Sequence, residues 1–141
     1  MNPKVIEAVR KLSATSFQRN HVVFNEGDQP DDVMYFVFKG EVGIFKKRED
    51  GEHQINSIQP GEFFGEMALI HNRPRLASAR VVSESAHMAV MDRSTLLKLA
   101  GHSPEFLFYL LRYAIKRLLA AEDKLQSVKE ALDDEKERRG R

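Results

Sequence analysis

The chain has 141 residues, of which 42% are hydrophobic, enough to bury one core of ordinary size. Its 22 basic and 21 acidic residues nearly cancel, so the overall charge does not indicate a nucleic-acid or membrane-surface partner. It contains no cysteine, which excludes disulfides, thiolate metal sites and cysteine nucleophiles. No apolar run approaches the ~20 residues of a membrane span and no signal-peptide pattern is present, so we expect a cytoplasmic protein.

The first element expected is a helix over residues 2–15. Val5, Val9 and Leu12 recur at helical spacing on one face, and Pro3 suits a first helical turn. We interpret this helix as a packing element without a functional role.

Residues 17–92 are expected to form a series of short strands. Runs rich in Val, Ile, Phe and Tyr are separated by Gly, Asp, Asn and Pro, and Asp50-Gly51 is a strong hairpin signal. This spacing predicts an antiparallel β-barrel or jelly roll, and such a barrel has room for one small ligand or is filled by its own side chains. The strands are expected over residues 22–24, 33–39, 42–46, 53–58, 76–82 and 86–91.

Two helices are expected after the strands. Asp92 can cap a short helix that Gly101 would stop, and Ser103-Pro104 can start a second helix without another Pro or Gly until Gly140. The fold class is therefore α+β, mainly β, with an N-terminal helix and a long C-terminal helix. We expect two parts, a domain over residues 1–103 and a long helix over residues 104–141.

The long helix carries a coiled-coil repeat. Its apolar residues follow one another at alternating steps of four and three, which is the seam of a coiled coil. We therefore predict a parallel homodimer through residues 104–135. The alternative is a monomer whose helix folds back on the barrel and frays beyond Leu125. The seam residues are Leu107, Leu111, Ala114, Leu118, Ala121, Leu125, Val128 and Leu132.

The most informative stretch is 60–82, which sets two charges among apolar or small residues. If a helical turn follows Gly65, its free N–H groups suit an anion, and the planar fork of Arg75 fits paired phosphate oxygens. Small Ala77 leaves space and a free N–H, and Glu66 could accept hydrogen bonds from ribose hydroxyls. These features indicate a nucleotide of low charge. The alternative is that Glu66 and Arg75 form a structural ion pair.

This stretch closely resembles the phosphate-binding cassette of cyclic nucleotide-binding domains. The residues that carry the resemblance are Phe64-Gly65-Glu66-Met67-Ala68-Leu69-Ile70 and Pro74-Arg75-Leu76-Ala77-Ser78. The likeness extends over residues 15–125, and the last two helices resemble those of bacterial regulators of the catabolite activator type.

The resemblance implies cyclic AMP (cAMP) or cyclic GMP (cGMP) bound inside the jelly roll. Glu66 would take the ribose 2′-hydroxyl, and Arg75 would pair with the cyclic phosphate, helped by N–H groups near Gly65 and Ala77. Each isoleucine and each residue on the long helix has an alternative role, as core filler or as a solvated charge. The other implied ligand contacts are Phe64, Met67, Ala68 and Leu76 in the cassette, Ile44, Ile55 and Ile58 at the base, and Arg117 and Glu122 on the long helix.

Two departures from the family concern the base. Leu76 stands where a hydroxyl residue binds the guanine amino group in cyclic GMP receptors, which favours cyclic AMP. Ala121 and Glu122 stand where the catabolite activator type has two hydroxyl residues facing the adenine amino group. Glu122 could accept a hydrogen bond from either base, so this position does not decide between them.

The function expected from the sequence is a non-enzymatic cyclic nucleotide sensor. The five histidines are scattered without metal-site spacing, and no nucleophile–base pair stands out, so neither a metal nor a cofactor nor catalysis is expected. No helix-turn-helix follows the long helix, so direct nucleic-acid binding is not expected. The coiled coil would signal to a downstream protein. The alternative is a ligand-independent structural or interaction module that dimerises through the same helix.

Overall fold

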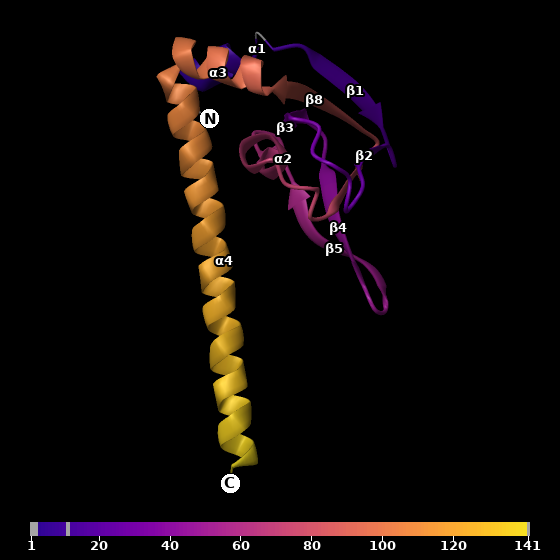
Figure 1. Ribbon diagram of the computed structural model, residues 1–141, viewed down its shortest axis with the longest axis vertical. Coiled ribbons are helices and arrows are strands. Elements are labelled where there is room, and N and C mark those ends of the chain that lie inside the picture. The colour runs from indigo at the N-terminus through magenta and orange to yellow at the C-terminus, as the bar shows by residue number, and fades with distance from the viewer. Residues whose placement is uncertain (1–2, 11, 141) are drawn as a thin grey trace. The chain divides into compact units, whose positions relative to one another are not determined.

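The structure is a computed structural model that describes residues 3–10 and 12–140, so Met1, Asn2, Lys11 and Arg141 lie outside the described residues. The chain divides into two units, one up to Phe106 and one from Leu107 (Figure 1). The first unit contains all of the strands and three complete helices, and the second is formed by most of the long helix α4.

The strands form two four-stranded sheets in which every pairing between the strands is antiparallel. The predicted mainly-β antiparallel architecture is confirmed, whereas closure of the two sheets into one barrel remains a prediction. In spatial order, the first sheet contains β1 (Ala14–Gln18), β8 (Ser85–Asp92), β3 (Val33–Lys39) and β6 (Phe63–Phe64), and the second contains β2 (Val22–Phe24), β7 (Ser78–Val81), β4 (Val42–Arg48) and β5 (Gly51–Ile58).

The hairpin between β4 and β5 forms where the Asp-Gly signal predicted it, and Figure 1 shows it extending from its sheet. Arg48 pairs with Gly51 across a two-residue turn. Gly51 has a φ of 119°, a conformation that is costly for residues with a side chain, which explains why a glycine directly follows the turn.

The first helix is shorter than predicted. Helix α1 (Pro3–Arg10) buries Val5 and Val9 on its inner face, as expected, but it ends at Arg10. The expectation of a helix through Thr15 is wrong, because residues 14 and 15 belong to β1 and pair with β8. Pairing with a distant strand overrides local helical periodicity at this point.

Two short helices follow the strands that position them. Helix α2 (Glu66–His71) is the turn predicted within the cassette, and α3 (Arg93–His102) begins at the predicted cap, where the Asp92 side chain accepts the backbone N–H of Thr95. The predicted stop at Gly101 is wrong. Its surroundings are open and the helix continues to His102.

The core of the first unit lies between the two sheets. Its largest buried side chains include Phe36 and Phe63, and Phe63 makes an edge-to-face contact with Phe106 with ring centroids 5.6 Å apart. Phe106 is therefore the buried residue of the short α4 segment, residues 104–106, that belongs to the first unit. One central cluster draws on both sheets, with Phe24, Val42, Ile58, Ala79 and Val81 from the second and Tyr35, Val37, Phe64, Ala86 and Met88 from the first.

Helix α4 (Pro104–Arg139) begins at the predicted proline and runs without interruption. Along the second unit, the large seam residues are exposed, and a coiled coil that would cover them remains a prediction. Among the described residues, no helix combines the length and the apolar character needed to cross a membrane. The exposed seam residues are Leu107, Leu111, Leu118, Leu125, Val128 and Leu132.

Candidate functional site

The site begins at a glycine between β6 and α2. Gly65 has a φ of 79°, in the left-handed region where glycine is strongly favoured. A Cβ atom placed there would lie 2.7 Å from Nη1 of Arg75 and 3.2 Å from the ring of Tyr35. Gly65 therefore makes the turn into α2 and also leaves room for the Arg75 guanidinium.

Arg75 is the charged centre of the site, and only 5% of its surface is exposed. Its Nη1 donates to the backbone oxygen of Gly65 at 2.8 Å. Its Nη2 donates to Oδ1 of Asp31 at 2.5 Å and to the backbone oxygen of Val33 at 3.1 Å. The carboxylate paired with Arg75 is thus that of Asp31, which follows the turn before β3 and was not singled out in the sequence.

Aromatic rings surround this guanidinium. Its carbon lies 4.1 Å from the ring centroid of Phe24, within the range of a cation–π contact. Tyr35 stacks on Phe64 with ring centroids 4.9 Å apart. Burial raises the pKa of the Tyr35 hydroxyl, the carboxylate of Asp31 raises it further, and Arg75 opposes the rise. The arginine therefore sits in a site of low polarity, where its electrostatic interactions are strengthened.

The backbone of Arg75 is held by the turn that follows β2. Its N–H donates to the oxygen of Asp28 at 2.9 Å, and its own oxygen accepts the N–H of Gly27 at 2.8 Å. The neighbouring Glu26 N–H donates to Oγ of Ser78 at 2.8 Å. These three bonds fix the segment that follows α2 against a turn about 50 residues earlier in the chain.

One donor of Arg75 has no acceptor among the described residues. Its Nε is buried and makes no hydrogen bond there. Leaving a buried donor unsatisfied costs about 1–3 kcal/mol, and more when the group is charged. An anionic oxygen reaching this nitrogen would remove that cost.

The predicted cassette residues occupy different environments around this centre. Glu66 is the first residue of α2 and is half-buried, and Ala77 is half-buried after the loop. Phe64 and Ala68 are buried, whereas Met67 is 42% and Leu76 is 55% exposed. The cassette therefore has a buried inner layer and an exposed apolar rim.

The three isoleucines expected at the base are not equivalent. Ile58 is 1% exposed and belongs to the central core cluster, and Ile44 packs partly against the same cluster. Ile55 is 44% exposed. For Ile58, the alternative role of filling the core agrees best with its burial. Contact with the ligand remains a prediction for each of the three isoleucines.

Arg93 connects the cassette helix to the helix after the strands. From the first turn of α3, its Nη2 donates to the backbone oxygen of Leu69 in α2 at 2.8 Å, and it lies 3.7 Å from Oδ1 of Asp32. This side chain therefore bonds the start of α3 directly to α2. The predicted contacts on α4 belong to the second unit, where Arg117 lies 5.6 Å from the ring centroid of Tyr113.

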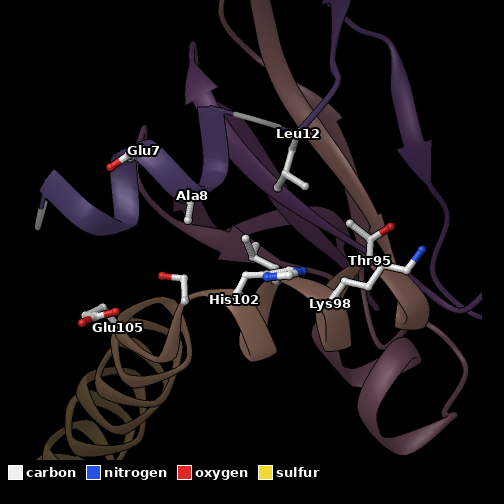
Figure 2. Close-up of a pocket in the computed structure, with 9 residues that line it drawn as sticks. Glu7, Ala8, Leu12, Thr95, Lys98, His102 and Glu105 are labelled. Carbon is white, nitrogen blue, oxygen red and sulfur yellow. The ribbon is translucent and has the colours of Figure 1, made fainter.

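A separate cavity of about 730 Å³ lies between α1 and α3. Figure 2 shows Glu7 and Ala8 of α1 on one side and Lys98 and His102 of α3 on the other. None of its lining residues belongs to the 60–82 stretch. It mixes acidic, basic and apolar groups, so it is distinct in place and in chemistry from the arginine site.

Comparison with known proteins identifies the family. The family model of the cyclic nucleotide-binding domain matches residues 14–103, which include the whole cassette and both sheets. The chain belongs to the cyclic nucleotide-binding domain family. The contacts among Gly65, Arg75 and Asp31 described above therefore lie within a cyclic nucleotide-binding domain.

Similar proteins include regulators from bacteria and animals. The chain is 34% identical over 120 residues to the CRP-like cAMP-activated global transcriptional regulator of Mycobacterium tuberculosis, covering 84% of this chain and 53% of that protein. It is 31% identical over 90 residues to a cAMP-dependent protein kinase type II regulatory subunit of Drosophila melanogaster, covering 64% of this chain and 24% of that one. The chain thus spans about half, or less, of the length of these relatives.

A solved structure shares the fold of this cyclic nucleotide-binding domain. The Thermus thermophilus catabolite activator protein superimposes with a TM-score of 0.76 at 26% identity, covering 92% of this chain and 61% of that one. This likeness extends beyond the residues matched by the family model, and therefore includes part of the long helix.

Proposed function

We propose that the protein is a cytoplasmic, non-enzymatic receptor for a 3′,5′-cyclic nucleotide. The observation that carries this proposal is the Arg75 guanidinium, buried beside Gly65 with its Nε lacking an acceptor among the described residues. A cyclic phosphate bears one negative charge and exposed oxygens, and an arginine fork matches it in geometry and charge. Membership of the cyclic nucleotide-binding domain family and the cAMP-linked names of its relatives support this ligand class.

We assign the ribose 2′-hydroxyl to Glu66, because it is the acidic residue directly after Gly65. We propose cyclic AMP in preference to cyclic GMP, because Leu76 has no hydroxyl to bind a guanine amino group. Leu76 is also 55% exposed, so its side chain is placed on the rim rather than in the core. Arg117, Glu122 and the isoleucines remain proposed ligand contacts, with Glu122 and the isoleucines on the side of the base.

The proposed output is a change in what α4 presents to a second copy and to a downstream protein. A ligand shifts a conformational equilibrium only when it binds the two states with different affinities. Phosphate bound at Arg75 would act on α2, and Arg93 links α2 to the start of α3 through the Leu69 oxygen. The homodimer through residues 104–135 is part of this proposal.

One observation favours the ligand-independent alternative. Arg75 already has three hydrogen bonds to acceptors in the chain and an aromatic ring on its face. An arginine held in this way can serve the fold alone. In that case the chain would be a structural module that dimerises through α4, and the nucleotide would have no role.

Isothermal titration of the full chain distinguishes the two functions. Cyclic AMP, cyclic GMP and linear 5′-AMP are titrated separately, with 5′-AMP as the control for the purine and ribose without the cyclic phosphate. We expect micromolar or tighter binding of cyclic AMP, weaker binding of cyclic GMP, and little binding of 5′-AMP. Binding of all three only above millimolar concentration would favour the structural module.

A further inference from the structure

The positions beside the α4 seam change in character along the helix. With Leu111, Leu118, Leu125 and Leu132 at heptad position a, the seam is flanked by positions e and g. In the first part of the helix these positions are apolar, as in Phe108 and Ile115, which are 66% and 47% exposed. From Arg117 onward they are mostly charged. The e positions then hold Glu122, Lys129 and Lys136, and the g positions hold Arg117, Lys124, Ala131 and Arg138.

The first charged g and e positions match each other across a parallel dimer. In such a dimer, the g residue of one helix faces the e residue that lies five positions later on its partner, and these pairs set orientation and register. Arg117 is at g and Glu122, five residues later, is at e. Arg117 of one copy would therefore face the partner's Glu122, and the two-fold symmetry of a dimer would repeat the pair on the other side.

The surroundings of Glu122 along its own helix contain no cation. The residues one turn away on α4 are Leu118, Leu119, Leu125 and Gln126. Elsewhere on the same helix opposite charges do pair at this spacing, as in the 3.1 Å contact between Arg139 Nε and Glu135 Oε1. A carboxylate beside an apolar seam, with no basic residue one turn away, is therefore suited to a cation from another helix.

We propose that Arg117 and Glu122 form reciprocal ion pairs between two copies of α4, and that these pairs fix a parallel, in-register homodimer. This inference rests on the homodimer of the proposed function and adds the pair of residues that would fix its parallel orientation and register. It also gives Glu122 a partner other than the nucleotide base. The partner copy would therefore contact Arg117 and Glu122, two residues that the family resemblance linked to the ligand.

The charge pattern opposes the antiparallel arrangement. In an antiparallel pair, g positions face g positions, and every charged g residue among the described part of α4 is basic: Arg117, Lys124 and Arg138. The parallel arrangement contains one like-charge contact, between Lys124 and the partner's Lys129. Like charges at such positions are destabilising, so Lys129 offers a site where a charge change should strengthen the dimer.

Charge exchange in the full chain tests the pairing. Arg117→Glu and Glu122→Arg should each raise the dimer dissociation constant by about tenfold or more, because two attractive contacts become repulsive. An equimolar mixture of the two variants should form a heterodimer of near wild-type affinity, and the double variant should recover as a homodimer. Lys129→Glu should lower the dissociation constant. Lys116→Glu is the control, with the same charge change as Arg117→Glu at outward position f.

Sedimentation without nucleotide gives these constants, and energy transfer gives the orientation. Dyes on a Gly140→Cys chain, which has no other cysteine, should lie close together in a parallel dimer. In an antiparallel dimer they would be separated by about 50 Å, the length of the second unit's helix. An unchanged constant for both single variants, failure of the mixture to recover, or weak energy transfer within a formed dimer would overturn the pairing. A monomeric wild-type chain would overturn it too, whereas nucleotide titration of that chain tests the receptor function separately.

Discussion

Two regions of this molecule reverse the usual distribution of polar and apolar side chains. In the cassette, the arginine at position 75 is 5% exposed, although arginine is almost never fully buried without a partner. On α4, Leu125 is 69% exposed, although leucine is among the residues most often buried. Burying a charge and exposing apolar surface both raise the free energy of the folded chain, and the two regions compensate for this in different ways.

In the cassette, groups of the same chain compensate for the buried charge of Arg75, with one exception. Asp31, two backbone oxygens and the Phe24 ring compensate for the buried charge, and only Nε lacks a partner among the described residues. The exposure on α4 recurs with the heptad from 107 to 132. A single unpaired donor suits a small anion, whereas an extended apolar stripe suits a second helix with the same repeat.

The largest effect is expected from Arg75→Ala. Removing one member of a buried, hydrogen-bonded charge pair should weaken nucleotide binding by about 2–5 kcal/mol. The fold should lose stability as well, because Asp31 and the Gly65 oxygen lose their donors. Calorimetric titration with cyclic AMP and thermal unfolding of the same preparation measure the two effects.

Arg73→Ala is the matched control for this change. Arg73 lies in the same loop and is exposed, so its removal should leave binding and stability nearly unchanged. Arg75→Lys separates charge from geometry, because lysine keeps the charge and loses the planar fork. Affinity for cyclic AMP that survives Arg75→Ala in a folded protein would contradict the phosphate assignment.

The second effect concerns the seam. Leu118 is 58% exposed, so Leu118→Ala should change the stability of the single chain by less than about 0.5 kcal/mol. In a dimer the same residue is buried twice, and truncation should cost about 2 kcal/mol or more for each copy. Sedimentation over a range of concentrations would therefore show a much weaker dimer.

Leu97→Ala provides the comparison for the seam variant. Leu97 is 65% exposed on α3 and does not belong to the heptad, so its truncation should leave association unchanged. Equal behaviour of the Leu118 and Leu97 variants would remove the distinction between the seam and an ordinary exposed leucine.

The third effect compares two glycines. Gly65→Ala places a side chain at a φ of 79° and its Cβ 2.7 Å from Nη1 of Arg75, so we expect a loss of about 1–3 kcal/mol of stability. Gly101→Ala lies within α3, where the added Cβ would meet no atom within 4 Å apart from neighbouring residues and the helix's own backbone, so it should stabilise by about 0.5–1 kcal/mol. Chemical denaturation measures both, and a loss of similar size in both variants would show that the Gly65 environment is not special.

The sequence predicts the local parts of both regions. Turn chemistry at Asp50-Gly51, the cap at Asp92 and the start of α4 at Pro104 depend on neighbouring residues, and each is confirmed. The turn of helix after Gly65 is confirmed for the same reason. Local signals suffice where the stabilising partner is only a few residues away.

The parts that the sequence misses depend on distant partners. Asp31 lies 44 residues from Arg75, and nothing in the Asp31-Asp32 pair shows which arginine it will meet. Residues 14 and 15 fit a helical pattern but pair with β8, more than 70 residues later. The signal available in the sequence was the acidic pair Asp31-Asp32 directly before the apolar strand at Val33. It indicates a polar end to the strand but does not identify Arg75 as the partner.

The smallest effect expected comes from a charge that is neither buried nor part of the seam. The Asp92 carboxylate accepts the backbone N–H of Thr95 at 2.8 Å, and this bond lowers the pKa of Asp92. In the unfolded chain the pKa of an aspartate is about 3.9. A carboxyl group whose pKa is lower than this in the folded chain stabilises the fold at pH values above about 3.9. That contribution is lost as the pH falls through the folded value.

Asp92→Asn isolates this contribution, because asparagine caps a helix without titrating in this range. The difference in melting temperature between wild type and the variant should decline as the pH falls below about 4, and other carboxyl groups cancel in that difference. A difference that stays constant from neutral pH to about pH 3 would show that the Asp92 charge adds nothing to the cap. The cap would then act through hydrogen-bond geometry alone, unlike Arg75, whose proposed role requires its charge.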